Sequence, residues 1–199
     1  MKKVLTLLTA LALALSLAAC GSKAEPSPYA GAKMGDVLQL GGIDWYVIRV
    51  EDGKALLVSV DILEKRGYHE EWEKITWETC DLRQFLNGEF YEETFSDEEK
   101  EWIAESALVN DVSEYPEFET EAGNDTVDKV FLLSIQEAEE YFAGDKDRKT
   151  ETFDSWWLRT PGRKSQSAAT YVSASGSIST GGYSGSNQVG LRPALWLIV

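Results

Sequence analysis

The sequence predicts an α+β fold, a single compact domain with an N-terminal β-hairpin, about three helices and short C-terminal strands. Residues 36–60 form a hairpin pattern rich in Val, Ile, Trp and Tyr. Helical spacings with capping signals follow between residues 80 and 142, and short strand-like runs separated by Gly and Ser end the chain. Helices placed between a first hairpin and a last set of strands are typical of an α+β domain.

The hairpin is predicted from "DVLQLGGIDWYVIRVEDGKALLVSV". Asp52 and Gly53 stand between two apolar runs, and both residue types tolerate the positive φ angles of a tight hairpin turn. We therefore expect the domain to open with a short strand and a β-hairpin.

The helical region begins with "CDLRQFLNGEF", in which the apolar residues have helical spacing and Asn87–Gly88 is the predicted stop. Ser96 and Glu99 form a capping box for a second helix. Ser134 and Glu137 form another, for a helix that Gly144 is expected to end.

Short strands are predicted for the rest of the domain. "VFLL" at 130–133 is expected to be a buried strand, and "WWLR", "TYVSA", "SGSIS" and "QVGLRPALWLIV" follow after residue 155. Gly190 and Pro193 bound the last run, so that strand is expected to bend or begin anew there.

The N-terminus predicts a lipoprotein signal peptide at residues 1–19. Lys2 and Lys3 precede an apolar run that is too short for a comfortable membrane span. The run ends in Leu17-Ala18-Ala19-Cys20-Gly21, which resembles the bacterial lipobox. We expect cleavage before Cys20, lipidation of its thiol, and an extracytoplasmic protein anchored by lipid to the bacterial cell membrane.

Two further boundaries follow from composition. Residues 20–33 are small, polar and proline-bearing, which predicts a flexible tether. Residues 34–199 are long enough for one α+β binding domain with its own core.

Charge is distributed very unevenly. The chain has a formal net charge of −15, yet all 34 acidic residues precede residue 155. The segment 155–199 carries only the cations Arg159, Arg163, Lys164 and Arg192. So acidic a protein argues against nucleic acid as a partner, because phosphate attraction needs clustered cations.

The sequence offers little for catalysis. It has one histidine, His69, and once Cys20 is lipidated Cys80 is the remaining cysteine, expected as a small buried thiol. No nucleophile elbow, phosphate-binding loop or dinucleotide fingerprint occurs, and one His with one Cys makes no ordinary zinc site. We therefore predict a protein that is not an enzyme and needs no metal or other cofactor.

Two alternatives stay open beside a binding function. One is a glycan-processing enzyme that uses a carboxylate pair, since acidic residues are plentiful. The other is a structural or accessory envelope lipoprotein without a ligand. The segment "NDTVDK" (124–129) carries oxygen ligands suited to calcium but matches no EF-hand loop.

A series of segments resembles a known family. "GDVLQLGGIDWYVI", "WETCDLRQFLNGEFYEETFSDEEKEWI", "DKVFLLSIQEAEEYF", "SWWLRTPG" and "VGLRPALWL" together look like the bacterial domain-of-unknown-function family six-two-seven-three, over about residues 35–199. That resemblance implies no activity.

More distantly, the ending "WWLRTPG…GLRPALWL" is similar to that of C-type-lectin-like domains, including the formylglycine-generating-enzyme type. This implies neighbouring N- and C-terminal strands and a ligand face on late strands and loops. The copper-binding cysteine pair of that enzyme and the Glu-Pro-Asn motif of animal lectins are absent. The resemblance therefore implies a binding module without that catalysis or that calcium-dependent sugar binding.

A binding face is predicted in the final third of the chain. If "WWLR" is a strand, Trp156 and Trp157 point to opposite faces, and we expect Trp157 to be the outer one. Tyrosine among small polar residues is typical of binding loops. The predicted binding residues are Trp157, Arg163, Lys164, Tyr171, Tyr183 and Asn187.

Arg159 and Arg192 are expected to be structural, paired with carbonyls or a carboxylate. The resulting prediction is a cell-surface lipoprotein with a non-catalytic ligand-binding module. Its expected partners are the membrane, through the lipid on Cys20, and an extracellular glycan, wall polymer or protein.

Overall fold

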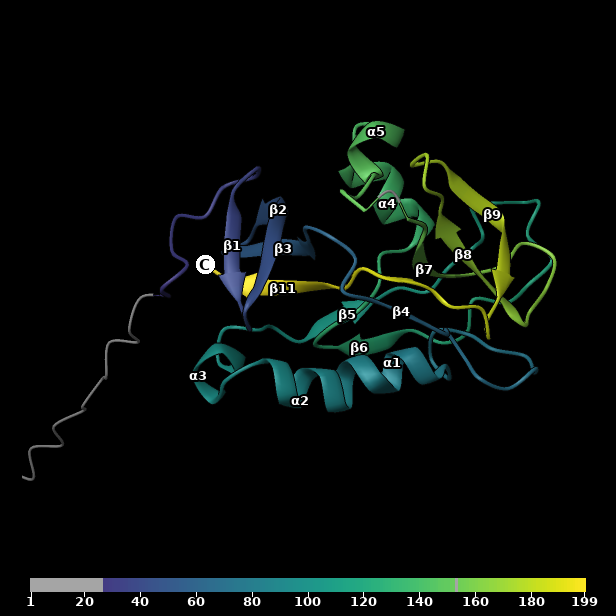
Figure 1. Cartoon of the computed structure of the whole chain (residues 1–199), viewed down its shortest axis with the longest axis horizontal. Coiled ribbons are helices and arrows are strands. Elements are labelled where there is room, and N and C mark those ends of the chain that lie inside the picture. The colour runs from purple at the N-terminus through teal and green to yellow at the C-terminus, as the bar shows by residue number, and fades with distance from the viewer. Residues whose placement is uncertain (1–26, 153) are drawn as a thin grey trace, which may run out of the picture.

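The computed structural model describes residues 27–152 and 154–199. The predicted signal peptide (1–19), the lipidation site Cys20 and the first half of the predicted tether lie outside the described residues. Figure 1 shows two main sheets side by side, with α1, α2 and α3 running along one side of the molecule and α4 and α5 on the other. The predicted mixed α/β architecture in one domain is confirmed.

The first sheet joins the beginning and the end of the described chain. It contains β1 (Val37–Leu40), β2 (Ile43–Glu51), β3 (Lys54–Ser59) and β11 (Ala194–Ile198), in the order β1-β2-β3-β11 with antiparallel neighbours. The predicted hairpin turn is confirmed, with φ angles of 48° at Asp52 and 71° at Gly53. The C-terminal strand thus pairs with the N-terminal hairpin.

The second sheet is built mainly from the acid-free end of the chain. It has the order β4-β10-β7-β8-β9, in which β10 and β7 are the parallel pair. Its strands are β4 (Glu64–Arg66), β7 (Trp156–Pro161), β8 (Ala168–Val172), β9 (Ile178–Ser184) and β10 (Val189–Leu191).

The predicted break in the last run is confirmed at Arg192–Pro193. There the chain leaves β10 in the second sheet and enters β11 in the first. Pro193 has no N–H for a ladder, and its carbonyl accepts a hydrogen bond from the Ser59 N–H at 3.0 Å. The two sheets share one continuous core, in which Trp45, Trp77 and Trp156 are fully buried.

The first helical segment is longer than predicted. It comprises α1 (Asp81–Phe85), a π-helical turn η1 (Leu86–Phe90) and α2 (Tyr91–Thr94). The prediction that Asn87–Gly88 ends the helix is wrong. The Asn87 amide oxygen accepts from the backbone N–H groups of Lys129 (2.7 Å) and Val130 (3.2 Å), so it bonds a neighbouring segment, and Gly88 absorbs the kink.

Both predicted capping boxes are present. The Ser96–Glu99 box begins α3 (Asp97–Lys100), which is only one turn long, and the Ser134–Glu137 box begins α4 (Ile135–Tyr141). α4 ends before Gly144, since Phe142 is already extended, and α5 (Asp145–Arg148) follows.

The strand predicted at 130–133 is wrong. This segment is fully buried, but it makes only one bridge, between Phe131 and Ala194. It crosses β11 at a single residue, so burial and separate hydrogen bonds, such as that from the Arg159 N–H to the Leu133 carbonyl at 2.9 Å, hold it in place of a ladder. An antiparallel ribbon forms instead nearby, from β5 (Ser106–Leu108) and β6 (Thr126–Asp128).

Part of the predicted tether contacts the domain. The Ser27 hydroxyl donates to the Ile198 carbonyl at 2.7 Å, and residues 27–33 form turns. Among the helices that the structure describes, none has the length and apolarity needed to cross a membrane.

Candidate functional site

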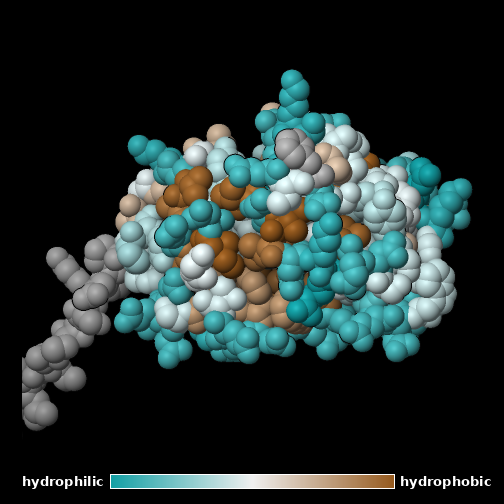
Figure 2. Space-filling view, in the orientation of Figure 1, coloured by the Kyte–Doolittle hydropathy of each residue, from teal (hydrophilic) through white to brown (hydrophobic). Residues whose placement is uncertain are grey.

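A groove of about 450 Å³ opens between the first sheet, the β5–β6 ribbon and α4. Its lining comes from the β2–β3 turn, every residue from Glu105 to Val109, the first two turns of α4, Arg159 and Trp196. In Figure 2, apolar side chains gather over the first sheet and toward the centre of the view, with hydrophilic side chains around them. The groove itself combines apolar side chains with a larger number of charged and polar ones, and concave sites are where proteins usually bind ligands.

The apolar part of the groove comes from three different elements. Trp196 of β11 is half-buried, Tyr141 ends α4 and is half-buried, and Leu108 of β5 is buried. Val109, just after β5, is 67% exposed. The Arg49 guanidinium lies 5.2 Å from the centroid of the Tyr141 ring and fixes one side of it. These side chains leave apolar surface open to a ligand.

Arg159 lies at the base of the groove and is 3% exposed. Its guanidinium makes an ion pair with both carboxylate oxygens of Glu137. It also donates to the carbonyls of Leu132 (2.9 Å) and Val109 (3.2 Å) and to the Asn110 side chain (3.1 Å). The predicted structural role of Arg159 is confirmed, because all three nitrogens bond within the protein.

Glu137 has two roles at this point. One carboxylate oxygen accepts from the backbone N–H of Ser134 in the capping box, and the same carboxylate binds Arg159. The start of α4 is therefore tied directly to β7. Burial raises the pKa of the Tyr141 phenol, and the nearby charges of Glu137 and Glu140 add to this rise. Tyr141 is consequently a neutral hydroxyl at the groove wall.

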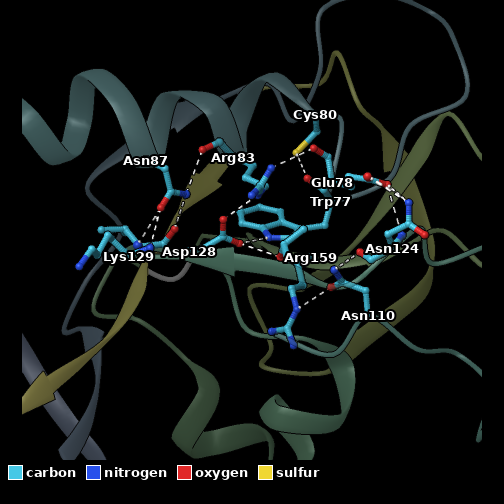
Figure 3. Close-up of polar contacts among 12 residues, drawn as sticks. Trp77, Glu78, Cys80, Arg83, Asn87, Asn110, Asn124, Asp128, Lys129 and Arg159 are labelled. Carbon is cyan, nitrogen blue, oxygen red and sulfur yellow. Dashed lines mark hydrogen bonds and ion pairs between the residues drawn. The ribbon is translucent and has the colours of Figure 1, made fainter. Parts of the chain in front are cut away.

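A network of hydrogen-bonded polar side chains holds Asn110, in the segment that follows β5 (Figure 3). Asn110 accepts from Arg159 and donates to the Asn124 carbonyl at 2.8 Å. The Asn124 amide donates to the Glu78 carboxylate at 3.1 Å, and these hydrogen bonds lower the pKa of Glu78. The chain of contacts links the groove to the loop before α1.

The comparisons with known proteins give one match. The family described as a domain of unknown function, DUF6273, matches residues 52–199. The chain belongs to this family. No curated protein and no solved structure matches the chain. The matched range contains every groove-lining residue of this DUF6273 domain except Glu51.

The expectation that Trp157 is an outer residue is wrong. Trp156 and Trp157 are both 0% exposed, because each face of β7 in the DUF6273 domain is covered. The Trp157 indole donates to the Arg66 carbonyl at 2.8 Å and packs edge-on against Tyr68, with 5.7 Å between ring centroids. Trp156 packs against Phe142 on the other side.

The other predicted binding residues lie partly together. Tyr171 and Tyr183 stack face to face, with ring centroids 4.0 Å apart and an interplanar angle of 7°. The neighbouring Tyr171 hydroxyl raises the pKa of Tyr183. The Arg163 backbone N–H donates to the Thr180 carbonyl in β9, and exposed Asn187 lies in the turn after β9.

Of the two predicted cations, Lys164 is exposed and Arg163 is less available. Arg163 is only partly exposed, and its Nε atom is buried without a hydrogen-bond partner in the described chain. Lys164 is exposed and lies 3.9 Å from the Glu119 carboxylate. Lys164 lines a separate, polar depression of about 880 Å³, together with Glu121 and Asn124. None of the six predicted residues lines the groove.

His69 and Cys80, the side chains that could act as a general base or a nucleophile, both lie outside the groove. His69 is 7% exposed and lies between two carboxylates, with Nε2 3.1 Å from Glu73 and Nδ1 3.0 Å from Asp81. Cys80 is buried, and burial raises its pKa to about 12. Among residues 27–152 and 154–199, no three His, Cys, Asp or Glu side chains are grouped to hold a metal ion.

Sequence reasoning missed the groove residues Val109, Tyr141 and Trp196. The one available signal was Val109, an apolar residue next to "NDVSE", where the chain turns polar. Trp196 lies in an apolar run that is typical of a fully buried strand, yet it is half-buried and lines the groove.

Proposed function

We propose that this chain is a non-catalytic ligand-binding module that is displayed outside the cytoplasmic membrane through a lipid on Cys20. The groove carries this proposal. It combines apolar surface from Trp196, Tyr141 and Val109 with charged side chains at its rim, and Arg159 fixes its base. The ligand class is an extracellular glycan, a wall polymer or a protein.

The arrangement of the strands supports a C-type-lectin-like architecture for this module. That resemblance implies neighbouring N- and C-terminal strands, and β11 pairs with β3 of the N-terminal hairpin. The ligand face differs from the one that the resemblance implies, because the groove lies between the first sheet, the ribbon and α4 and not on β8 and β9.

The charge at the groove disfavours a strongly anionic ligand. Its lining contains the carboxylates of Glu51, Asp52, Glu105, Glu137 and Glu140 against the cations Lys54 and Arg159. Because a rim of carboxylates repels polyanions, wall polymers of high negative charge are the least suited of the candidate ligands.

An array of glycans, wall polymers and proteins, probed with the purified full chain, tests the binding function. We expect at least one ligand whose binding is lost in Val109→Lys, which places a charge in the groove. Val127→Lys is the matched control, because Val127 is 60% exposed on β6 and lies outside the groove. Ligands that bind Val109→Lys as tightly as the native chain would place the binding site outside the groove. An array on which no ligand binds would contradict the binding function.

Two further measurements test the other parts of the proposal. Detergent-phase partitioning that disappears in Cys20→Ser supports the lipid anchor, and a mature protein that starts at another residue contradicts it. Hydrolysis assays on glycans, esters and peptides should be blank. An activity that co-purifies with the chain and vanishes in His69→Ala would show that the module is catalytic.

A further inference from the structure

The strand β5 has an open edge beside the groove. In the part of the chain that the structure describes, β5 pairs with β6 along one edge only. All residues from Glu105 to Val109 line the groove, so the other edge of β5 faces it. An open strand edge presents N–H and C=O groups that an added strand can satisfy. The Val109 carbonyl, just beyond β5, already accepts from Arg159, so the available edge is that of Ser106–Leu108.

The open edge of β9 is less suited to an added strand. The β8–β9 register shifts between Ala169 and Tyr171, and Gly182 has a φ of +74°. A bulge with a kinked residue breaks the regular row of backbone groups that a partner strand needs. The β5–β6 pairing continues without a shift in register from Ser106 to Leu108.

The side chains beside β5 favour alternating apolar and basic residues in a ligand. Val109 and Trp196 offer apolar surface. Glu137 and Arg159 neutralise each other, which leaves four lining carboxylates and Lys54.

Two cations reach the rim from outside the lining. Arg49 is shared between Glu51 (2.6 Å) and Glu140 (2.5 Å), and Lys129 lies 3.9 Å from Glu105. Because one guanidinium serves two carboxylates, the rim keeps an excess of negative charge. A cationic ligand is therefore favoured over an anionic one.

We propose that the groove takes an extended peptide segment of a partner protein, added as a strand to the open edge of β5. Successive side chains of a strand point to opposite sides. Glu105 and Val109 both stand on the exposed side of β5, whereas Ser106 and Leu108 are buried. One set of alternate ligand residues, Lys or Arg, lies over that exposed side and meets the carboxylates of Glu105 and Glu140, and the other set, apolar, packs toward Trp196. This inference rests on the proposed binding function and selects a protein ligand for it.

Fluorescence anisotropy with labelled, end-blocked peptides tests the inference on the purified full chain. The probes are an alternating Lys-Val hexapeptide, the corresponding Glu-Val hexapeptide, and the Lys-Val peptide with alternate backbone nitrogens methylated. We expect the Lys-Val peptide to bind at least about tenfold more tightly than either of the others, and more weakly as salt is added. Val109→Lys should weaken it about tenfold or more, and Val127→Lys should leave it unchanged.

Several results would overturn the inference. Equal binding of the methylated peptide would exclude strand addition, and equal binding of the Glu-Val peptide would exclude the charge preference. Absence of peptide binding, together with a glycan or polymer that binds on the array and is lost in Val109→Lys, would reject the peptide ligand and leave the binding function standing. A blank result in both experiments would reject both.

Discussion

The guanidinium carbon of Arg192 lies 5.0 Å from the centroid of the Trp156 ring. Arg192 is 3% exposed and donates to the carbonyls of Ser59 (3.0 Å) and Arg148 (3.1 Å). It directly precedes Pro193, where the chain changes from the second sheet to the first. One buried cation thus fixes the crossover, and its burial lowers the pKa of Arg192 to about 10.

Arg192→Ala should lower the free energy of unfolding by about 3 kcal/mol, because it removes the cation–π contact and the hydrogen bonds to the buried carbonyls of Ser59 and Arg148. Urea denaturation measures the change. Arg49→Ala is the control and should cost clearly less, because the Arg49 side chain is 37% exposed and exposed ion pairs contribute little to stability. Similar losses in the two variants would contradict the structural role of Arg192.

Asp128→Asn should lower the free energy of unfolding by about 2–4 kcal/mol. The buried carboxylate accepts from the Trp77 indole (2.8 Å), from Arg83 (2.7 Å) and from the Thr126 hydroxyl (2.9 Å). The amide keeps the shape, but it turns a donor toward these donors and removes the counter-charge of Arg83 (Figure 3). Asp44→Asn is the control, since exposed Asp44 accepts from Gln39 alone among the described side chains. An unchanged midpoint for Asp128→Asn would show that the charge is dispensable.

The Cys80 thiol should resist maleimide in the native protein and react once the protein is unfolded in urea. Cys80 is 0% exposed, and burial raises its pKa to about 12, so thiolate is scarce near neutral pH. The full chain with Cys20→Ser leaves Cys80 as the remaining thiol. Mass spectrometry after timed labelling measures the rate, and fast labelling without urea would contradict the buried position.

The same thiol predicts a loss of stability in alkali. Its pKa is about 12 in the folded protein and near its ordinary value of 9.0 in the unfolded chain. The unfolded state therefore loses this proton first, so the contribution is complete below about pH 9 and is lost as pH rises toward 12.

Cys80→Ala should show a shallower alkaline slope of unfolding free energy than the native sequence, by up to about 1.4 kcal/mol per pH unit. Burial also raises the pKa of Tyr68, and the charge and hydrogen bond of Cys80 add to this rise. Cys80→Ala therefore removes the Cys80 part of the Tyr68 shift as well, which makes the alkaline slope shallower in the same direction. Urea titrations at a series of pH values measure the slopes, and parallel slopes would contradict the shift at Cys80.

Gly182→Ala should cost about 1–3 kcal/mol of unfolding free energy. Gly182 has a φ of +74°, and a Cβ atom there would lie 2.6 Å from the Ala169 carbonyl oxygen. Gly181→Ala is a matched control on the preceding residue, where an added Cβ meets no atom within 4 Å. Thermal unfolding of the two variants measures the difference, and equal costs would exclude the kink in β9 as a requirement of the fold.

The sequence alone determined the elements whose cause is local. Asp52–Gly53 forms the predicted hairpin turn, the Ser134–Glu137 capping box begins α4, and Pro193 breaks the last strand. Each depends on backbone angles or hydrogen bonds within a few residues. Local reasoning failed at Asn87–Gly88, which was predicted to end a helix. The Asn87 side chain instead bonds to Lys129 and Val130 in a distant segment.

Only the tertiary structure decided which side chains are covered. Strand periodicity places Trp156 and Trp157 on opposite faces, but burial of both depends on Tyr68 and Phe142, which arrive from other parts of the chain. The groove has the same origin, since Val109, Tyr141 and Trp196 come from three separate elements. Burial is set by what packs against a face, and that partner is remote in sequence, so no local pattern of residues encodes it.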